Sequence, residues 1–394
     1  MKVLILGIDG YLGWPLAMRL ANKGHKVYGI DDLSRRRRVM ERGSDSAIPI
    51  TTLKERVDKF AEKEPKAYEI NYEIFDLRNT KKVMDYFNRE QVMGNFDAIV
   101  HFGEIPSAPY SMKNVHNAIE THEVNVNGTL NILWAMKEYC PEAHLIKLGT
   151  MGEYGTPGVT INEGFCTSIN GEEADPKAKL LFPRSAGSFY HQTKVHDTNN
   201  VLFACKMWNI KSTDIMQGVV YGTITDEINL DPKLKTRFDF DGTWGTVVNR
   251  FCVQAILGIP LTVYGKGGQT RGYLNIRDTM NCIETILERP PEAGEYRTIN
   301  QFTEVMSVNQ IAQLVKKHAD KLGLCVKIES IPNPRIESEQ HKYPVISKKL
   351  RELGFEITQT MEANITEMLR DLMKHKDRLE AFRESVMPEV NWGR

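Results

Sequence analysis

The sequence carries no excess of charge of either sign, and this absence bears on its partners. Lysine and arginine together number 51, aspartate and glutamate also number 51, and the formal net charge is zero. Because nucleic-acid-binding domains usually carry a marked basic excess, we expect no nucleic-acid partner. A local basic pocket is still compatible with this balance.

Long apolar runs are missing as well. No segment reaches the roughly 18 consecutive apolar residues from which a membrane-spanning helix is predicted, so we expect no membrane insertion. The first strand pattern begins at once, at Met1–Gly7, with no signal or transit segment ahead of it. The sequence as it stands therefore predicts a cytoplasmic protein.

The cysteines show no clustered pattern. Six of them are scattered along the chain without a Cys-x-x-Cys pair, at Cys140, Cys166, Cys205, Cys252, Cys282 and Cys325. This spacing favours neither a disulfide framework nor a metal site. We expect reduced thiols packed as small apolar side chains, and no bound metal.

Strand and helix patterns alternate through the first half of the chain. Short apolar runs fall at 3–6, 26–30, 72–75, 98–102 and 144–148, with a helical pattern at 14–23. Strands that alternate with helices are typical of a parallel sheet covered on both faces. We predict an α/β fold with a Rossmann-type doubly wound parallel sheet, whose ligands bind at the carboxyl ends of the strands.

Changes in this rhythm predict two domains. Residues 1–220 are expected to form the sheet domain, with an insertion at about 33–71 and an active-site loop at about 156–187. Residues 221–394 are expected to form a smaller mixed α/β substrate-binding domain, with a short return to the first domain near 300–310. The expected elements in these parts are helices near 52–63, 246–257, 278–288, 307–320 and 358–384, and a strand at 261–264.

A glycine-rich motif, Gly7-Ile-Asp-Gly10-Tyr-Leu-Gly13, follows the first strand and opens the first helix. Glycines there let the backbone turn tightly and approach a pyrophosphate at the helix N-terminus. Asp31 ends the next strand, where a carboxylate accepts hydrogen bonds from ribose hydroxyls and disfavours a 2′-phosphate. The motif predicts NAD, and the expected cofactor-binding residues are Gly7, Asp9, Gly10, Tyr11, Leu12, Gly13, Asp31, Asp32, Ser34, Arg35, Arg36, Asp76, Leu77, Phe102, Gly103, Tyr190, Lys194, Gln217 and Val220.

Four consecutive arginines, Arg35 to Arg38, complicate the choice of cofactor. They could bind a 2′-phosphate and admit NADP, or they could form a solvated charged face. We favour NAD, with one arginine stacked on the adenine.

A Tyr-x-x-x-Lys motif, Tyr190-His-Gln-Thr-Lys194, lies in a helical stretch after the fifth strand. Residues four apart share one face of a helix. A lysine cation lowers the pKa of a nearby tyrosine, so that tyrosinate can take a proton from a sugar hydroxyl. Thr150 ends the fifth strand and can hydrogen-bond the same hydroxyl, so we predict all three as catalytic residues. Tyr and Lys also meet at this spacing by chance, but their place in a dinucleotide-binding fold favours the catalytic interpretation.

These motifs resemble the extended short-chain dehydrogenase/reductase family, and the similarity covers most of the chain. Its members include UDP-glucose 4-epimerase and the nucleotide-sugar 4,6-dehydratases, in which Thr or Ser, Tyr and Lys form the oxidising unit. The dehydratases carry Thr-Asp-Glu where this chain has Thr150-Met151-Gly152. Since that acidic pair eliminates water across C5 and C6, the departure argues against a standard 4,6-dehydratase mechanism.

Longer strings narrow the resemblance. Residues 149–157, 188–197, 217–222 and 261–278 are similar to the members of this family that form UDP-sulfoquinovose. The resemblance implies UDP-glucose and sulfite as substrates: oxidation at C4, loss of water across C5 and C6, addition of sulfite at C6 and reduction at C4. His191 and Glu153 are then the candidate acid/base catalysts. Alternatively, His191 only packs behind Tyr190, and Glu153 faces away from the sugar or caps a turn.

The resemblance also implies substrate-binding residues. Arg271 matches the arginine that grips the UDP diphosphate, for which a guanidinium fork is suited, and Thr262 and Tyr264 match the strand that cradles uracil. The other candidates are Thr150, Gln217, Asn249, Arg250, Gln269 and Arg335, of which Arg250 and Arg335 could also form surface salt bridges. Ile105-Pro106 stand where plant-type members have Gln-Arg, so an arginine that could contact sulfite is missing.

Two other functions stay open at this point. One is that of another NAD-dependent nucleotide-sugar 4-epimerase or dehydratase. The other is a non-catalytic NAD-binding sensor or scaffold, which the presence of Thr150, Tyr190 and Lys194 disfavours. The family implies a homodimer or a homotetramer, and sulfite can enter free or from a sulfite-delivering protein.

Overall fold

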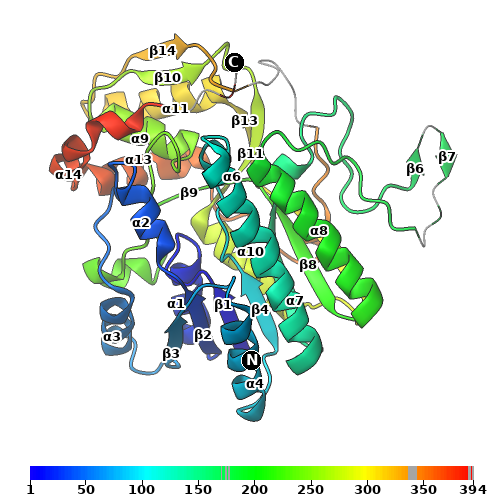
Figure 1. Ribbon diagram of the computed structural model, residues 1–394. Coiled ribbons are helices and arrows are strands. Elements are labelled where there is room, and N and C mark those ends of the chain that lie inside the picture. The colour runs from blue at the N-terminus through cyan, green and yellow to red at the C-terminus, as the bar shows by residue number, and fades with distance from the viewer. Residues whose placement is uncertain (170, 174, 176–177, 336–343, 389–391, 393–394) are drawn as a thin grey trace.

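The computed structural model describes residues 1–169, 171–173, 175, 178–335, 344–388 and 392. Its central feature is a seven-stranded sheet in which all neighbouring strands are parallel (Figure 1). In spatial order the strands are β12 (Tyr296–Gln301), β8 (Lys211–Gln217), β5 (His144–Thr150), β4 (Ala98–His101), β1 (Lys2–Leu6), β2 (Lys26–Asp31) and β3 (Ile70–Ile74). The strand order reverses between β1 and β4, as in a doubly wound Rossmann-type sheet, so the predicted fold class is confirmed.

Strand β1 shows why this sheet is buried on both faces. All five of its residues are buried. Val3 and Ile5 belong to one apolar core, and Leu4 and Leu6 belong to another, because successive side chains of a strand point to opposite faces. A continuous apolar run is typical of a parallel strand that is covered on both sides.

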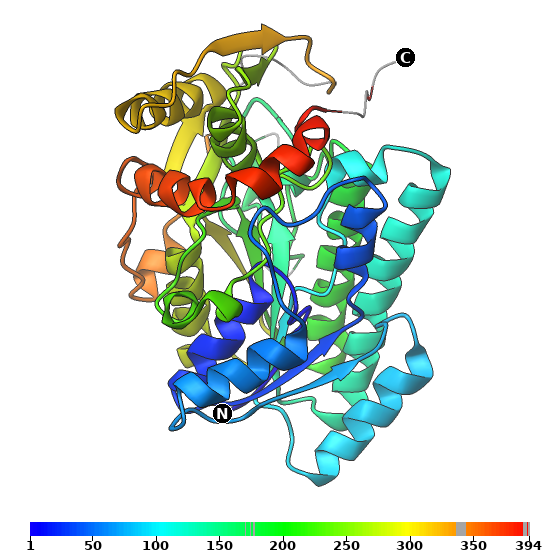
Figure 2. The same ribbon diagram turned by 90° about the vertical axis from the view of Figure 1, so that its left-hand side faces the viewer.

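Helices cover both faces of the sheet. α1 (Gly13–Asn22) and α10 (Ile276–Glu288) contribute to the first of these cores, and α4 (Thr80–Val92), α7 (Gly128–Tyr139) and α8 (Phe189–Trp208) to the second. Figure 2 shows α7 and α8, in cyan and green, on the side of the sheet away from the blue α1. The carboxyl ends of the strands are thereby left for ligands.

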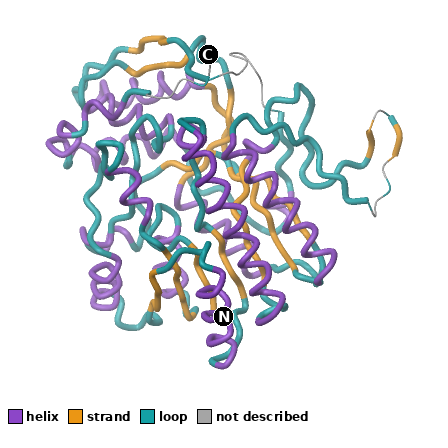
Figure 3. The backbone as a smooth tube through the Cα atoms, in the orientation of Figure 1, coloured by secondary structure: helices purple, strands orange, loops and turns teal. Residues whose placement is uncertain are grey.

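A smaller lobe lies at the carboxyl ends of these strands, in the upper part of Figures 1 and 3. It holds a three-stranded sheet and a separate parallel pair of strands, with four helices packed around a core of their own. Its elements are β9 (Val219–Tyr221), α9 (Val247–Ile256), β10 (Leu261–Tyr264), β11 (Thr270–Asn275), β13 (Glu304–Ser307), α11 (Val308–Lys321), β14 (Ile328–Ile331), α13 (Met361–Met373) and α14 (Lys376–Ala381). This is the mixed α/β lobe that the sequence predicts, whereas the exact division at residue 220 stays a prediction.

The chain returns to the central sheet earlier than the predicted range of 300–310. Strand β12 already pairs with β8 from Tyr296, and residues 304–307 form β13 in the smaller lobe. The string Tyr-Arg-Thr-Ile-Asn-Gln of β12 contains only two apolar residues, although nearly all of it is buried. Because the strand is mostly polar, the hydrophobic pattern of the sequence does not predict it.

The insertion at 33–71 packs on its own chain. Helix α3 (Leu53–Lys63) is the one that was predicted, and α2 (Ser34–Met40) was not, because its run of arginines shows no apolar period. Between them, Ala47 and Ile48 lie in the core of the smaller lobe, and the Ala47 amide donates to the Phe238 carbonyl at 2.9 Å. The insertion therefore ties the two lobes together.

The remaining short elements complete the described chain. They are α5 (Ala108–Ser111), α6 (Val115–His122), the π-helical turn η1 (Glu123–Asn127), η2 (Met151–Glu153), β6 (Ser168–Ile169), β7 (Glu172–Glu173), η3 (Ile228–Leu230), η4 (Pro232–Leu234), α12 (Lys349–Glu352) and η5 (Arg383–Val386). None of the helices in the described residues is long and apolar enough to cross a bilayer.

Candidate active site

A cavity runs along the carboxyl ends of β1, β2, β4 and β5. Of the nineteen predicted cofactor-binding residues, eighteen line it, and Arg36 does not. The cavity thus brings together residues from sequence positions as distant as Gly7 and Val220. This is the crevice in which doubly wound sheets bind their ligands.

The glycine-rich loop closes one side of this cavity. Gly7 has a φ of +84°, and a Cβ atom there would lie 2.8 Å from the carbonyl carbon of Phe102. A Cβ atom on Gly13 would lie 2.1 Å from the Gly7 carbonyl oxygen. Among the described residues no side chain caps the N-terminus of α1, whose positive end favours an anion, although the Trp14 amide already donates to the Gly10 carbonyl at 3.3 Å and Pro15 has no N–H. This loop fits the pyrophosphate of a dinucleotide.

Asp31 lies where a ribose would be recognised. Its carboxylate accepts hydrogen bonds from the Leu33 amide at 2.7 Å and the Asp9 amide at 2.9 Å, which fix its orientation. Burial, together with the nearby charge of Asp9, raises the pKa of Asp31 to about 7. Asp32 accepts hydrogen bonds from the amide and hydroxyl of Ser34 at the start of α2.

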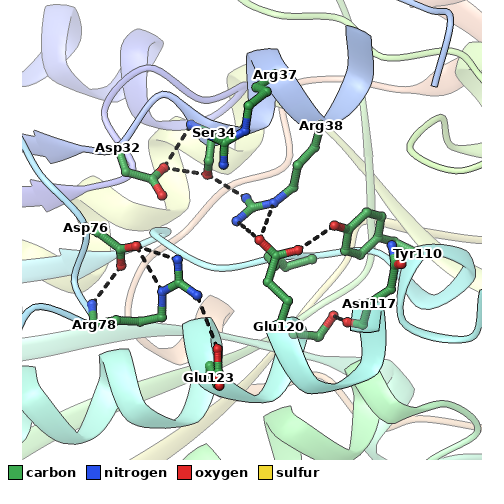
Figure 4. A network of polar contacts seen from close by, with 12 residues as sticks. Asp32, Ser34, Arg37, Arg38, Asp76, Arg78, Tyr110, Asn117, Glu120 and Glu123 are labelled. Atoms are coloured by element: carbon green, nitrogen blue, oxygen red, sulfur yellow. Dashed lines mark hydrogen bonds and ion pairs between the residues drawn. The ribbon is translucent and has the colours of Figure 1, made fainter. Parts of the chain in front are cut away.

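The arginines of α2 are mostly held by carboxylates. Arg36 donates twice to Asp9 at 2.7 Å, and buried Arg56 of α3 binds the same carboxylate. Figure 4 shows Arg38 reaching across from α2 to Glu120 of α6, at 2.9 Å. Guanidinium groups that already pair with carboxylates are poor candidates for binding a 2′-phosphate. Because only NADP carries this phosphate, the pairing favours NAD.

Arg35 was the candidate for stacking on the adenine, and its neighbour in the structure is Trp244. Its guanidinium carbon lies 3.9 Å from the centre of the Trp244 indole ring, and its Nη1 is 3.8 Å from Asp239. Both partners belong to the smaller lobe and line the cofactor cavity. The smaller lobe therefore forms part of the cofactor cavity.

A second cavity continues from the first into the smaller lobe. The two cavities share Thr150, Tyr190, Gln217 and Trp244. The second cavity is also lined by the catalytic candidate His191 and by the predicted substrate residues Arg250, Tyr264, Gln269, Arg271 and Arg335. Two predicted substrate residues do not reach it: Asn249 lines the cofactor cavity, and Thr262 is buried and accepts a hydrogen bond from Gln254.

Three guanidinium groups line this second cavity. Arg250 is almost fully buried and donates to the Tyr264 hydroxyl at 2.8 Å, so it is not in a surface salt bridge. Arg335 lies over the ring of Trp392, at 5.1 Å from its centre, and Arg271 donates to the backbone of Thr270. Concentrated positive charge in a partly enclosed cavity is suited to a diphosphate.

Buried polar atoms without protein partners point to a ligand in both cavities. Within the described part of the chain, no hydrogen-bond partner is found for the Gln269 side-chain oxygen or Arg250 Nε beside the second cavity. The same holds for the Asn249 side-chain oxygen beside the first. Because buried polar groups are nearly always hydrogen-bonded, such atoms fit a polar ligand.

Thr150, Tyr190 and Lys194 meet where the two cavities join. Thr150 ends β5, and the N-terminus of α8 places Tyr190 and Lys194 on one helical face. Thr150 hydrogen-bonds the Tyr190 side chain. The Tyr190 amide is fixed by the Ser111 hydroxyl at 2.9 Å. The structure thus assembles the three residues that the sequence predicts as the oxidising unit.

The motif predicts that the charge of Lys194 lowers the pKa of Tyr190, but in the structure the Lys194 ammonium is engaged by other groups. Its ammonium donates to the Leu148 carbonyl at 2.6 Å and forms an ion pair with buried Glu104. Burial lowers the pKa of Lys194 to about 8. Burial also raises the pKa of Tyr190, and the groups that oppose this rise include buried Lys147 and Thr150. Lys147, on β5, is a charge that the motif gave no reason to consider.

His191 occupies space that a glycine makes available. A Cβ atom on Gly152 would lie 2.3 Å from both Cδ2 and Nε2 of the His191 ring. Ser188 caps α8 and holds Nδ1 of the same ring at 3.0 Å. Burial, and then the charges of Arg335 and Arg271, lower the pKa of His191 to about 3. The imidazole is therefore neutral and directed into the substrate cavity.

Glu153 does not reach the substrate cavity. It is fully buried, lines neither cavity, and accepts a hydrogen bond from the Thr150 amide at 3.2 Å. Of the two sequence interpretations, the structure thus supports the capping of a turn. We do not place Glu153 among the groups that touch the substrate.

Some lining residues were not predicted. Trp244 lines both cavities, Glu104 and Arg237 line the cofactor cavity, and Trp392 lines the substrate cavity. Glu104 lies just after β4, beside the predicted Phe102 and Gly103, whereas the other three come from the smaller lobe or the C-terminal end of the chain. The loop at 156–187 contributes Thr156, Ser185 and Gly187 to the substrate cavity, while its β6–β7 tip extends away from the body of the molecule (Figure 1).

Comparison with known proteins confirms the family. The chain belongs to the NAD dependent epimerase/dehydratase family, whose model matches residues 3–300. NAD is the cofactor of this family, so the choice of NAD is confirmed. Within it, the chain is 48% identical over 394 residues to UDP-sulfoquinovose synthase of Sulfolobus acidocaldarius, covering 100% of this chain and 98% of that one.

A plant relative and a solved structure extend this comparison. The chloroplastic UDP-sulfoquinovose synthase of Spinacia oleracea is 44% identical over 391 residues, which cover 99% of this chain and 79% of that protein. A UDP-glucose 4-epimerase of Thermus thermophilus in complex with NAD has the same fold, with a TM-score of 0.66 and 21% identity over 94% of this chain and 99% of that one. The resemblance seen in the sequence is thereby confirmed.

Replacing Arg271 by alanine is expected to weaken binding of UDP-glucose about 10- to 100-fold, because a charge-assisted hydrogen bond contributes about 1.5–3 kcal/mol. Isothermal titration with UDP-glucose measures this change. Arg89→Ala is the matched control, since Arg89 lies exposed on α4 and pairs with Glu73. An unchanged affinity in Arg271→Ala would remove this residue from the diphosphate site.

Proposed function

We propose that this enzyme forms UDP-sulfoquinovose from UDP-glucose and sulfite. The observation that carries the proposal is the junction of the two cavities. There the oxidising unit is complete, and the dehydratase acids are replaced by Met151 and Gly152, with His191 over the glycine. The similarity to two synthases over nearly the full chain supports the same substrates.

The first chemical task falls to Tyr190 and Thr150. When bound, NAD would accept a hydride from C4 of the sugar and return it to C4 at the end of the cycle. As the hydride leaves C4, Tyr190 takes the proton of the C4 hydroxyl, and Thr150 hydrogen-bonds the same oxygen. Lys147 favours the negative charge on the tyrosine oxygen. At the end of the cycle the same tyrosine returns the proton to O4.

The second task, loss of water across C5 and C6, suits His191. A C4 ketone acidifies the C5 proton, so a modest base can remove it. His191 is neutral, and in the tautomer whose Nδ1–H donates to the Ser188 hydroxyl, Nε2 is an acceptor. Once protonated, the same imidazole can donate to the leaving C6 hydroxyl. One residue thereby serves as base and then as acid. Sulfite then adds to C6 of the resulting alkene, which is conjugated with the C4 ketone, and C5 takes a proton to complete the addition.

Binding of the diphosphate supports this use of His191. Arg271 and Arg335 lower its pKa in the free protein. A diphosphate bound between these guanidinium groups would offset their charge and stabilise the imidazolium. Substrate binding would therefore prepare His191 to hold the proton that it removes from C5.

The remaining steps of the proposal concern partners. We propose that sulfite is the second substrate, entering free or from a delivering protein, and that the enzyme works in the cytoplasm as a homodimer or homotetramer. Trp134, Phe203 and Met207, on α7 and α8, are 46%, 58% and 57% exposed, which supports a contact between copies. Light scattering measures the number of subunits.

The proposed function is tested by incubating the purified protein with UDP-glucose and sulfite, with and without added NAD. Mass spectrometry should detect a sulfonated UDP-sugar that requires sulfite, and product formed without added NAD would indicate retained cofactor. Formation of UDP-galactose at unchanged mass would instead favour an epimerase, and absence of turnover with both substrates would count against the proposal.

A further inference from the structure

A cluster of buried charged and hydroxyl groups lies beneath the active site. Glu153, Lys147 and Asp214 have fully buried side chains, and Thr198 of α8 lies between the two carboxyl groups. Tyr296 of β12 completes the cluster from the edge of the sheet. None of these groups lines either cavity, so binding of substrate does not explain them.

The hydroxyl protons in this cluster are too few for its contacts. Thr198 Oγ1 lies 2.9 Å from Glu153 Oε2 and 2.7 Å from Asp214 Oδ2. The Tyr296 hydroxyl lies 2.7 Å from the same oxygen of Asp214. Each hydroxyl has one proton, so two protons would have to serve three oxygen–oxygen contacts if both carboxyl groups were ionised. A third proton is needed, and it must be on Glu153 or on Asp214.

The neighbours of Asp214 favour its ionised form. Its Oδ2 accepts from two hydroxyls, and its Oδ1 lies 3.8 Å from the ammonium of Lys147, whose side chain is fully buried. If Asp214 were neutral, Lys147 would lose the partner of its ion pair, at high cost for a buried charge. Glu153 has one oxygen on Thr198, and the other accepts from the Thr150 amide, as a neutral carboxyl group can.

We infer that Glu153 is protonated in the active enzyme, donates its proton to the Thr198 hydroxyl, and acts as a positioning residue for the turn that carries Thr150. The proton then completes a chain of hydrogen bonds from Glu153 through Thr198 to Asp214. The other oxygen of Glu153 holds the Thr150 amide at the end of β5. This role goes beyond the proposed acid/base chemistry, in which Glu153 takes no part.

The electrostatic surroundings agree with this assignment. Burial raises the pKa of Glu153 to about 7, against the opposing charges of Lys147 and Arg184, whose Nε lies 3.7 Å away. The charged and titratable groups around Glu153 and its partners are Lys147 on β5, Asp214 on β8, Tyr190, Lys194 and Asp197 on α8, Arg184 before α8, and Tyr296 on β12. An ionised Glu153 would raise the pKa of Tyr190 further, so its proton favours the tyrosinate that the oxidation requires.

Infrared difference spectroscopy tests the proton directly. At about pH 6 the wild-type protein should show carbonyl bands of protonated carboxylic acids, and Glu153→Gln should remove the contribution of Glu153 while leaving that of buried Asp31, whose pKa is also raised to about 7. Glu163→Gln is the control and should leave the spectrum unchanged, since Glu163 lies outside the cluster and accepts from three backbone amides. A spectrum that Glu153→Gln leaves unchanged would overturn the inference.

Activity provides the second test, and it rests on the proposed function. Glutamine has the shape of a neutral glutamic acid, so Glu153→Gln should retain turnover within about threefold. Glu153→Ala should lose about tenfold or more, because Thr150 is then held less well. Wild-type turnover should fall as the pH rises through about 7 and Glu153 ionises, and Glu153→Gln should lack that fall. A Glu153→Gln variant that retains NAD but is inactive would overturn the positioning role, whereas the infrared result does not depend on the substrate.

Discussion

Replacing Tyr190 by phenylalanine is expected to lower turnover by about 10²- to 10⁴-fold, the usual contribution of a positioned acid/base group. Tyr190 lies where the cofactor and substrate cavities join and is hydrogen-bonded to Thr150. The variant keeps the ring but cannot take the proton of the C4 hydroxyl. Binding of UDP-glucose should therefore change little. The quantity to measure is reduction of the bound cofactor after UDP-glucose is added without sulfite.

Tyr68→Phe is the matched control for this experiment. Tyr68 is half exposed, at 50%, and lies in the insertion rather than at the junction of the cavities. Its variant should reduce the cofactor at the wild-type rate. Full activity in Tyr190→Phe would mean that another group accepts the proton, and the roles assigned to Thr150 and Lys147 would then have to be reconsidered.

The parts of the site that were predictable are those encoded by neighbouring residues. The turn of the glycine-rich loop, Asp31 at the end of β2 and the i, i+4 pair of Tyr190 and Lys194 each depend on a few adjacent positions. A parallel sheet then brings their carboxyl ends to one edge, because all its strands run in the same direction. Local pattern and a general rule of topology were sufficient here.

Other assignments depend on packing between distant segments, and these could not be read from the sequence. Arg35 and Arg36 are adjacent, yet about 100° of rotation about the helix axis separates their directions, so Arg35 faces Trp244 while Arg36 binds Asp9. Trp244 reaches both cavities only because the smaller lobe closes over the sheet. The sequence left Glu153 open as an acid/base catalyst or as the cap of a turn, and the fold shows that its side chain is buried and accepts from the Thr150 amide.

Replacing Gly152 by alanine is expected to lower turnover about as much as removing His191 itself, by roughly 10²- to 10⁴-fold if His191 is both base and acid. The added Cβ would lie 2.3 Å from two atoms of the His191 ring, so the ring must leave its position over the turn. In both variants the bound cofactor should still be reduced by UDP-glucose, because Tyr190 is untouched. Loss of water from the sugar should be the step that fails.

The double variant Gly152→Ala/His191→Ala separates this mechanism from a general disturbance of the turn. If the glycine acts only by making room for His191, the double variant should be no slower than His191→Ala, since both changes remove the same group. Gly128→Ala is the control for a buried glycine, as its Cβ would meet Leu77 at an ordinary 3.5 Å. Additive losses in the double variant would show that Gly152 serves the reaction independently of His191. Non-additive losses would indicate that glycine replaces the acidic residue of the dehydratases at position 152 in order to make room for the His191 ring.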